Sequence, residues 1–382
     1  MGNEYYKEQL NTLRNEGLYR QMRIIESPSG RLCSIKGEEK LVFCSNNYLG
    51  LANDRRIIST IKKGADDWGF GSGGSRLICG NTTPHEQLQK RLAQMLKKEA
   101  SLVFASGYAA NNAILSSLPQ EKDLILIDKL VHASLIDGAK AGQGQVRTYP
   151  HGNLKKLKRL LEKGGYNQAF IVTDSLFSMD GDKADLKELA ELKRKFEAVL
   201  MVDEAHAFGC VGPGGKGCAA DMGVLDEVDI FVATLSKAIG GAGGFVAGTN
   251  EIIDYLINKS RGFIYTTGIP AVNCLAAIAA LDIVEQEPQR RRRLIENGDY
   301  FRERCREMNL DIGESESYIV PIISGDAQKA TEAAEQLGQQ GFLIPAIRPP
   351  TVARGKARLR ISLMSEHTKE DVDRLCEAIG KL

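Results

Sequence analysis

The chain has 382 residues and a nearly balanced charge, with 50 Lys and Arg against 49 Asp and Glu. This balance excludes the strongly basic surface on which nucleic-acid-binding proteins depend. No apolar run approaches the roughly 20 residues that a membrane-spanning helix requires. The length favours one large and one smaller domain.

The N-terminal part combines a polar helix with short strands. Residues 3–24 are polar with interspersed leucines, which predicts an amphipathic helix with Arg20 and Arg23 near its end. An apolar run at 41–44 predicts a strand, and the polar residues Ser45-Asn46-Asn47-Tyr48 that follow it predict a turn. We therefore expect residues 1–45 to form an N-terminal helix and short strands ahead of the large domain.

Two glycine-containing stretches are candidates for close contact with a ligand. Residues 69–76 read Gly-Phe-Gly-Ser-Gly-Gly-Ser-Arg and fit neither a Walker A loop nor a dinucleotide fingerprint, so a flexible loop is an equal alternative. The strand predicted at 102–105 turns through Ser106, Gly107 and Tyr108 into a helix. Such a turn points N–H groups at an anion, which predicts a phosphate cradle, although a plain strand-to-helix turn would look similar.

Buried-strand patterns then alternate with helical ones. Apolar, β-rich runs occupy residues 124–128, 169–173, 198–202 and 229–233, and a helical pattern occupies 185–196. This alternation indicates a mostly parallel sheet in a three-layer α/β/α large domain, residues 46–288. Open sheets of this kind bind ligands at the carboxyl ends of their strands.

A lysine stands just beyond the last of these strands. Lys237 is a residue type that is rarely buried without a task, and its amine could form a Schiff base, although a solvated lysine in a glycine-rich loop is the alternative. Asp203 ends the preceding strand and His206 follows it. An acid, a histidine and a lysine in this order are what pyridoxal phosphate (PLP) needs. The carboxylate pairs with the pyridine nitrogen and the lysine holds the aldehyde carbon.

The C-terminal part reads as a second, smaller α/β domain, residues 289–382. A buried helix at 271–284 precedes it, and the basic run 290–293 predicts the exposed face of a connecting helix. Strand patterns follow, the last at 357–362. The eight cysteines form no C-x-x-C pair and no zinc-type cluster, which indicates reduced thiols in a cytoplasmic protein and no metal site.

Two motifs give the chain a family resemblance. Asp203-Glu204-Ala205-His206 with Thr234-Leu235-Ser236-Lys237 resembles the α-oxoamine synthases, PLP-dependent transferases of fold type I, the aspartate aminotransferase-like fold. The resemblance covers essentially the whole chain in the family's order, although Ser236 stands where many members carry Gly. It implies a homodimer with shared active sites, because residues 69–76 and 263–270 resemble segments at the family's subunit interface.

The resemblance also implies individual roles. Lys237, Asp203 and His132 match catalytic positions, with His132 stacked on the pyridine ring. The cofactor-binding positions that it implies are Gly107, Tyr108, His132, Ser178, Asp203, His206, Thr234 and Lys237. The substrate-binding positions are Arg20, Asn47, His132, Arg348, Thr351 and Arg360. Among these, Arg360 matches the arginine that clamps an α-carboxylate, a task suited to a bidentate guanidinium.

The implied reaction is a decarboxylating condensation of an amino acid with an acyl thioester. The stretch Ile347–Val352 is most similar to that of members that join L-alanine to a pimeloyl thioester in biotin biosynthesis. The sequence leaves open whether coenzyme A or acyl carrier protein carries the acyl group. The alternatives are a glycine-using member such as an acetyltransferase, amino-group transfer, and a non-catalytic scaffold subunit.

Overall fold

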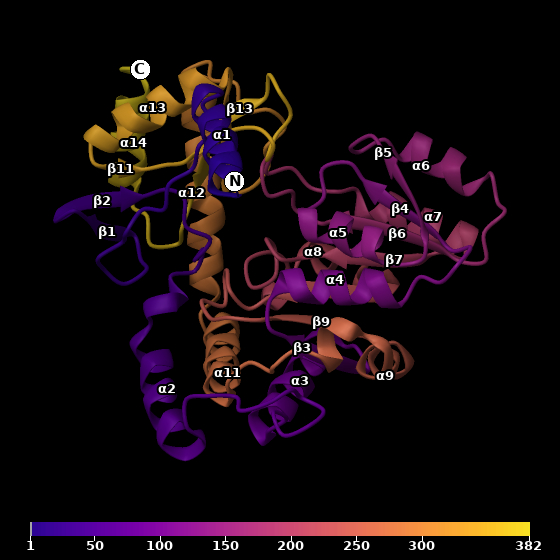
Figure 1. Cartoon of the computed structure of the whole chain (residues 1–382). Coiled ribbons are helices and arrows are strands. Elements are labelled where there is room, and N and C mark those ends of the chain that lie inside the picture. The colour runs from indigo at the N-terminus through magenta and orange to yellow at the C-terminus, as the bar shows by residue number, and fades with distance from the viewer. Residues whose placement is uncertain (1) are drawn as a thin grey trace. The chain divides into compact units, whose positions relative to one another are not determined.

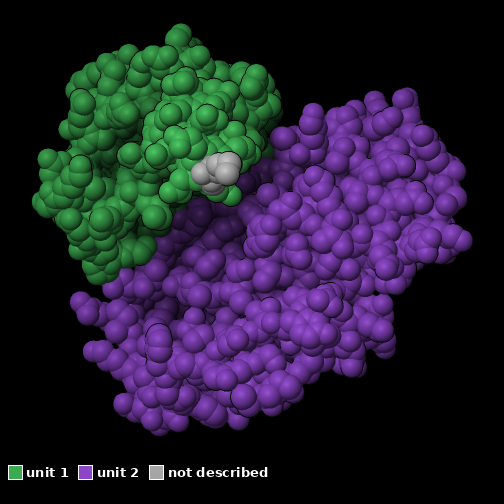
Figure 2. All heavy atoms as spheres, in the orientation of Figure 1, with its two compact units in different colours: residues 1–45, 179–182, 292–382 green, residues 46–178, 183–291 purple. Residues whose placement is uncertain are grey.

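The computed structural model describes residues 2–382, so that only Met1 of the predicted segment 1–45 lies outside it. Two compact units are distinguished in Figure 2. Unit 1 comprises residues 1–45, 179–182 and 292–382, and unit 2 comprises residues 46–178 and 183–291. Unit 1 thus joins most of the first and third predicted segments. The three-part division at 46 and 289 stays a prediction.

Unit 2 is built on a seven-stranded sheet with the order β3-β9-β8-β7-β6-β4-β5 (Figure 1). The strands are β3 (Ala100–Phe104), β4 (Leu124–Asp128), β5 (Gln145–Tyr149), β6 (Ala169–Asp174), β7 (Val199–Asp203), β8 (Ile230–Thr234) and β9 (Gly244–Gly248). The five strands from β8 to β5 are parallel, and β9 runs antiparallel to both β8 and β3. The predicted mostly parallel sheet is therefore confirmed.

Helices cover both faces of this sheet, which gives the three-layer α/β/α arrangement of fold-type I PLP transferases. The helices of unit 2 are α2 (Arg55–Trp68), α3 (Thr83–Leu96), α4 (Gly107–Ser117), α5 (Ala133–Ala141), α6 (Leu154–Leu161), α7 (Leu186–Phe196), α8 (Cys218–Asp221), α9 (Asn250–Lys259), α10 (Arg261–Ile264) and α11 (Ala271–Gln286). On one face Ile125 and Ile127 of β4 join a core with Ile114 of α4 and Leu135 of α5. Leu126 between them is fully buried on the opposite face, as the two-residue period of a strand requires.

Unit 1 contains two small sheets. Its elements are α1 (Gly2–Asn15), β1 (Leu32–Ile35), β2 (Glu38–Val42), most of α12 (Pro288–Glu307), β10 (Ile319–Gly325), α13 (Ala327–Gln339), β11 (Phe342–Leu343), β12 (Ala346–Ile347), β13 (Ala357–Ser362) and α14 (Lys369–Ile379). One sheet has the order β1-β2-β11 and the other β10-β13-β12. In the first, β2 and β11 are parallel, so Leu41 pairs with Phe342.

The N-terminal helix is shorter than predicted. It ends at Asn15 rather than near residue 24, because Gly17 adopts a φ of 66° that continues no helix. The N–H of Leu18 donates to the carbonyl of Leu13 at 2.8 Å, which closes the last turn. Arg20 and Arg23 therefore follow the helix instead of lying on it, and the prediction of helix over 16–24 was wrong.

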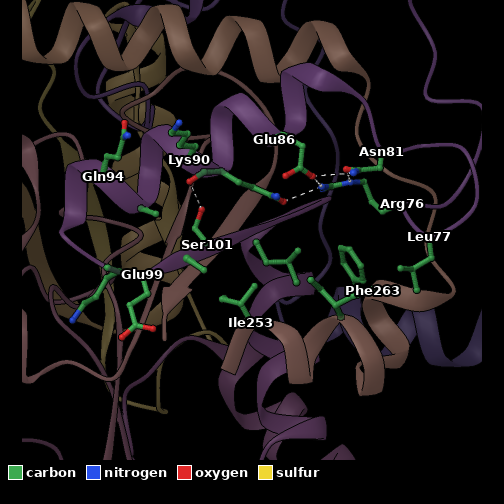
Figure 3. Close-up of a pocket in the computed structure, with 16 residues that line it drawn as sticks. Arg76, Leu77, Asn81, Glu86, Lys90, Gln94, Glu99, Ser101, Ile253 and Phe263 are labelled. Atoms are coloured by element: carbon green, nitrogen blue, oxygen red, sulfur yellow. Dashed lines mark hydrogen bonds and ion pairs between the residues drawn. The ribbon is translucent and has the colours of Figure 1, made fainter. Parts of the chain in front are cut away.

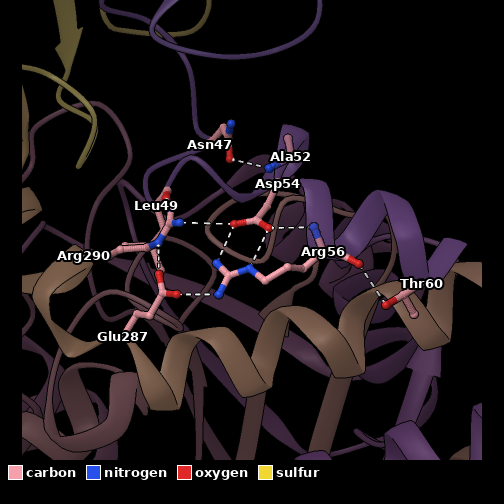
Figure 4. A network of polar contacts seen from close by, with 8 residues as sticks. All are labelled: Asn47, Leu49, Ala52, Asp54, Arg56, Thr60, Glu287 and Arg290. Atoms are coloured by element: carbon pink, nitrogen blue, oxygen red, sulfur yellow. Dashed lines mark hydrogen bonds and ion pairs between the residues drawn. The ribbon is translucent and has the colours of Figure 1, made fainter.

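The basic run at the start of α12 is only partly exposed. Arg292 and Arg293 are exposed as predicted, but Arg290 is not, because its guanidinium joins a polar network (Figure 4). It donates to the Leu49 carbonyl at 2.9 Å and to Glu287 Oε2 at 2.7 Å. Hydrogen bonds from the Arg56 and Arg290 guanidinium groups lower the pKa of the Glu287 carboxyl. Within residues 2–382 no helix combines the length and apolarity needed to cross a bilayer.

Candidate active site

The polar residues predicted at the strand ends gather at one edge of the unit 2 sheet. Asp174 ends β6 and Asp203 ends β7, and the two residues are direct partners in the parallel register. Lys237 follows the neighbouring strand β8, and His132 follows β4. All four stand at the carboxyl ends of parallel strands, where open α/β sheets bind ligands.

Lys237 is carried by a closely bonded turn between β8 and β9. The N–H of Leu235 donates to the Gly243 carbonyl at 2.9 Å, and the N–H of Gly241 donates to the Leu235 carbonyl at 2.8 Å. The Lys237 carbonyl accepts from the N–H of Gly240 at 3.0 Å. Because β9 returns antiparallel to β8, both ends of the turn are fixed by the sheet, and Lys237 is held half-buried on a rigid support.

Gly240 is a position in this turn where a side chain would clash with the backbone. Its φ is 72°, and a Cβ atom there would lie 2.4 Å from the Ala52 backbone nitrogen. We expect Gly240→Ala to lower the free energy of unfolding by about 2 kcal/mol or more, because backbone strain and a steric clash add. Urea unfolding would measure the loss. Gly241→Ala is the matched control, since its Cβ would come no closer than 3.4 Å to Leu235; equal losses in the two variants would contradict the expectation.

A short polar chain orients the lysine amine. Lys237 Nζ lies 2.8 Å from Nε2 of His206, and Nδ1 of the same imidazole lies 2.7 Å from the hydroxyl of Tyr48. Tyr48 in turn donates to Asn46 Oδ1 at 3.0 Å. His206 and Tyr48 are buried, so these contacts form in a region of low dielectric where they fix the amine's position.

Asp203 is a buried carboxylate that accepts hydrogen bonds from neutral donors. It is 6% exposed, accepts from Asn111 Nδ2 at 2.6 Å and accepts from the backbone N–H of Ala205 at 2.8 Å. The Asn111 amide also donates to Ser134 Oγ at 2.9 Å. Buried charge is costly unless it is paired, so this carboxylate is suited to a cationic ligand group.

His132 is held by its own backbone and by a hydroxyl. Its backbone N–H points at the Asp174 carboxylate at 3.2 Å, and its Nδ1 accepts from the Ser134 backbone N–H at 3.3 Å. Partial burial lowers the pKa of His132; the charge of Asp203 opposes this shift and that of Lys237 adds to it. The imidazole is exposed toward solvent, as a ring that contacts a bound aromatic ligand must be.

Asp174 is fully enclosed beside Asp203. Burial raises the pKa of the Asp174 carboxyl well above its usual value, and the negative charge of Asp203 raises it further. Two neighbouring carboxyl groups resist double ionisation, and the raised pKa favours the protonated form of Asp174. The edge therefore holds fewer negative charges than its carboxyl count suggests.

The start of α4 is the strand-to-helix turn for which an anion cradle is predicted. Ser106 caps the helix by accepting from the Ala109 N–H at 3.0 Å. A Cβ on Gly107 would lie 3.3 Å from the Cβ of Thr234, so the glycine lets the helix start closely approach β8. The Tyr108 hydroxyl donates to Asp137 at 2.6 Å, and its ring lies edge-on to His132 with centroids 6.5 Å apart.

These residues fit PLP. The half-buried amine of Lys237 suits its aldehyde, the buried carboxylate of Asp203 suits its pyridine nitrogen, and the N–H groups at the start of α4 suit its phosphate. In addition, Asn111 Oδ1 is buried and has no hydrogen-bond partner among the described residues. The donor set is therefore suited to PLP. Within residues 2–382 no group of three or more His, Cys, Asp or Glu side chains is placed to hold a metal ion.

Two further predicted positions belong to unit 2. Ser178 is half-buried beyond β6, and Asn47 is buried with its Oδ1 accepting from the Ala52 N–H at 3.1 Å, a contact that stabilises the turn. Their ligand roles stay predictions.

The four predicted substrate-binding residues of unit 1 have partners of their own. Arg360 on β13 is 5% exposed and donates to Ser362 Oγ at 2.7 Å. Arg20 donates to the Pro349 carbonyl at 3.5 Å, and Arg348 donates to the Gly17 carbonyl. Thr351 is exposed, and its N–H donates to the Arg348 carbonyl at 3.1 Å. Their roles at the substrate also stay predictions.

Tyr48, Asn111 and Ser134 contact predicted site residues, and the sequence reasoning gave them no role there. Tyr48 ends the polar turn predicted at residues 45–48, and only a turn was predicted there. Asn111 stands four residues after Gly107, among alanines, isoleucine and leucine of α4. A buried polar side chain on such a face is a usable signal, because it needs a partner.

A separate pocket of about 580 Å³ lies along the edge strand β3 of unit 2 (Figure 3). Arg76 at its rim donates to Asn81 Oδ1 at 2.8 Å and to Gln89 Oε1 at 2.9 Å. None of the predicted site residues lines it, and these polar groups bond to one another. We therefore assign the chemistry to the carboxyl edge of the sheet.

Comparison with known proteins agrees with this geometry. The model of the family "aminotransferase class I and II" matches residues 38–379. A Thermoanaerobacter pseudethanolicus 8-amino-7-oxononanoate synthase is 39% identical over 99% of this chain and 96% of its own length. One from Citrifermentans bemidjiense is 42% identical over 98% of both.

Solved structures give the same result. A serine palmitoyltransferase from S. paucimobilis with bound PLP superposes with a TM-score of 0.93 at 25% identity, covering 98% of this chain and 96% of that one. The 8-amino-7-oxononanoate synthase of Francisella tularensis superposes with a TM-score of 0.79 at 32% identity, covering 90% and 97%.

Proposed function

This chain belongs to the aminotransferase class I and II family, and within it to the α-oxoamine synthases, so we propose that it condenses L-alanine with a pimeloyl thioester. The products are 8-amino-7-oxononanoate, CO₂ and a free thiol, and the reaction serves biotin biosynthesis. The observation that carries the proposal is the convergence of Lys237, His206 and Asp203 at one sheet edge, in a chain similar over its full length to 8-amino-7-oxononanoate synthases.

The residues divide the work. Lys237 would hold the cofactor through its amine and would act as the general base that removes the proton from the α-carbon of the amino acid. Asp203 keeps the pyridine nitrogen protonated, and His132 contacts the face of the ring. When bound, PLP supplies an electron sink that stabilises negative charge at the α-carbon of the amino acid. His206 fixes the Lys237 amine and is suited to donate a hydrogen bond to the cofactor's 3′-oxygen.

The remaining predicted residues complete the proposal. The N–H groups around Gly107 and Tyr108, with Thr234 and Ser178, bind the phosphate end and rim of the cofactor. Arg360 binds the amino-acid carboxylate by its guanidinium fork. Arg20, Asn47, Arg348 and Thr351 contact the acyl substrate, whose carrier is either coenzyme A or acyl carrier protein.

We also propose a homodimer with shared active sites that works in the cytoplasm. The proposal for the dimer rests on the family resemblance of the segments 69–76 and 263–270. All eight cysteines are free thiols, and most of them are buried, which supports work in a reducing compartment.

Thiol release from the PLP-loaded protein tests the reaction. We expect rapid release with L-alanine plus pimeloyl-CoA, with matching CO₂. With glycine plus acetyl-CoA we expect release at least about tenfold slower, because a site matched to a long acyl chain gains its binding energy from that chain. Faster release with glycine and acetyl-CoA would assign the chain to the glycine acetyltransferases. No release in any pair, including pimeloyl-acyl carrier protein, would contradict an acyltransferase.

A further inference from the structure

Glu204 is a buried carboxylate that the proposed reaction does not use. It is fully buried, between Asp203 and the turn that carries His206. Its two oxygens accept three hydrogen bonds, from Ser175 Oγ at 2.6 Å and from the backbone N–H groups of Cys218 at 2.9 Å and Ala219 at 2.7 Å. The carboxylate therefore joins three separate segments of unit 2: the loop after β6, the turn after β7, and the start of α8.

The backbone groups of Glu204 are also hydrogen-bonded. Its N–H donates to the Val232 carbonyl of β8 at 2.7 Å, and its carbonyl accepts from the N–H groups of Ala207 at 2.9 Å and Phe208 at 2.7 Å. Residues 204–208 thus form a turn closed by two hydrogen bonds to the Glu204 carbonyl. His206 lies within this turn, and its Nε2 is 2.8 Å from Lys237 Nζ.

The loop before α8 encloses the Glu204 side chain. Gly217 adopts a φ of 97°, and a Cβ there would lie 2.5 Å from Glu204 Oε2. The side chain is therefore enclosed by the backbone to which it bonds. A shift of the carboxylate would have to move either α8 or the turn of His206, because interiors are close-packed.

We propose that Glu204 is a positioning residue for His206: its bonds to Ser175, Cys218 and Ala219 fix the turn that holds the imidazole against Lys237. The inference rests on the proposed function in taking Lys237 as the residue that holds the cofactor. It adds a role for the second letter of the Asp-Glu-Ala-His motif, whose first and fourth letters contact the cofactor in that function.

The electrostatics make this support sensitive to pH. Burial raises the pKa of Glu204 to about 7, although its three hydrogen bonds oppose the shift. As pH falls through this value the carboxylate gains a proton, and its charge-assisted bonds weaken. The titratable groups facing it are Asp203 on β7 and the Cys218 thiol on α8, and Lys183 and Asp221 act on that thiol.

The test compares Glu204→Gln with a control of the same kind. Glutamine keeps the size of the side chain but replaces one acceptor oxygen with an amide NH₂ group, which cannot accept from these donors, so at least one of the hydrogen bonds is lost. Asp123→Asn is the control: Asp123 is also buried and accepts two backbone N–H groups, from Gln120 and Gln168, but it stands before β4 at the opposite end of the strand.

With the PLP-loaded protein we expect Glu204→Gln to shift the pH midpoint of the bound cofactor's visible absorbance by about one unit. We expect kcat/KM to fall about tenfold to a hundredfold, the usual cost of a small displacement of catalytic groups. Asp123→Asn should change thermal stability only. The absorbance needs no acyl substrate, so it reports on the inference even if the proposed substrates are wrong.

A double-mutant cycle decides whether the effect passes through His206. If Glu204 acts by positioning the imidazole, Glu204→Gln should shift the midpoint by less than about a quarter of a unit in a His206→Ala background. Equal shifts in both backgrounds, or a loss of thermal stability alone, would overturn the inference. Should Glu204→Gln not fold, Ser175→Ala removes one of the three donors and takes its place, with the same two outcomes.

Discussion

Replacing Lys237 with alanine is expected to lower kcat by about 10⁴-fold, because the proton removed from the amino acid loses its acceptor. The variant should still bind PLP through the other contacts of the site, but dialysis should remove the cofactor, since no amine holds its aldehyde. Turnover and cofactor content are measured on the same preparations. The turn is held by backbone hydrogen bonds, so we expect the fold to survive the loss of the contact between the Lys237 amine and His206.

Two comparisons make the Lys237 result interpretable. Lys259→Ala, at the exposed end of α9, removes a lysine of the same unit and should leave turnover unchanged. Added methylamine should restore part of the activity of Lys237→Ala, because a small amine can replace the missing base. Full activity in Lys237→Ala without added amine would refute the catalytic assignment.

Replacing Asp203 with asparagine is the second substitution for which we expect a large loss of activity. The neutral amide cannot hold a proton on a pyridine nitrogen, so the cofactor stabilises negative charge poorly and kcat should fall about 10²–10³-fold. The hydrogen bond from the Ala205 N–H can persist, whereas the Asn111 amide now faces a second amide. Steady-state kinetics and the spectrum of the bound cofactor would both register the change.

Asp128→Asn is the matched control for Asp203. Asp128 is equally buried at the same sheet edge and accepts from the Leu130 and Gly152 N–H groups, each within 3.0 Å. It has no assigned role at the cofactor. A similar fall of kcat in both variants would mean that loss of a buried charge at this edge, and not loss of the ring-nitrogen partner, explains the result.

The sequence predicted the frame of the site because the frame depends on local patterns. Apolar, β-rich runs fixed the strands that end at Asp174 and Asp203, and the position just beyond a strand placed Lys237 at the carboxyl edge. Contacts across distant segments were beyond such reasoning. Tyr48 meets His206 across 158 residues of chain, and no periodicity encodes that pairing.

The sequence held a readable signal for some of the wrong or missing predictions but not for others. Gly17 marks the end of α1, since glycine favours the left-handed conformation that terminates a helix, yet the polar pattern of residues 18–24 suggested that the helix continued. Arg290 looked solvated because charge runs usually are, and its partners Asp54 and Leu49 are distant in sequence. Asn111 is a third case, where a buried amide stands on an apolar helix face.

The division of unit 1 among separate chain segments has a consequence for synthesis. Among the segments of unit 1, the N-terminal one leaves the ribosome before the others, but β2 finds its parallel partner β11 only when residues 342–343 have emerged. All seven strands of the unit 2 sheet lie between residues 100 and 248 and can pair before then. Domains generally fold as they are completed. Strand β2 therefore lacks its β11 partner, and the paired strands β1 and β2 stay open to proteases and chaperones, until residues 342–343 have been made.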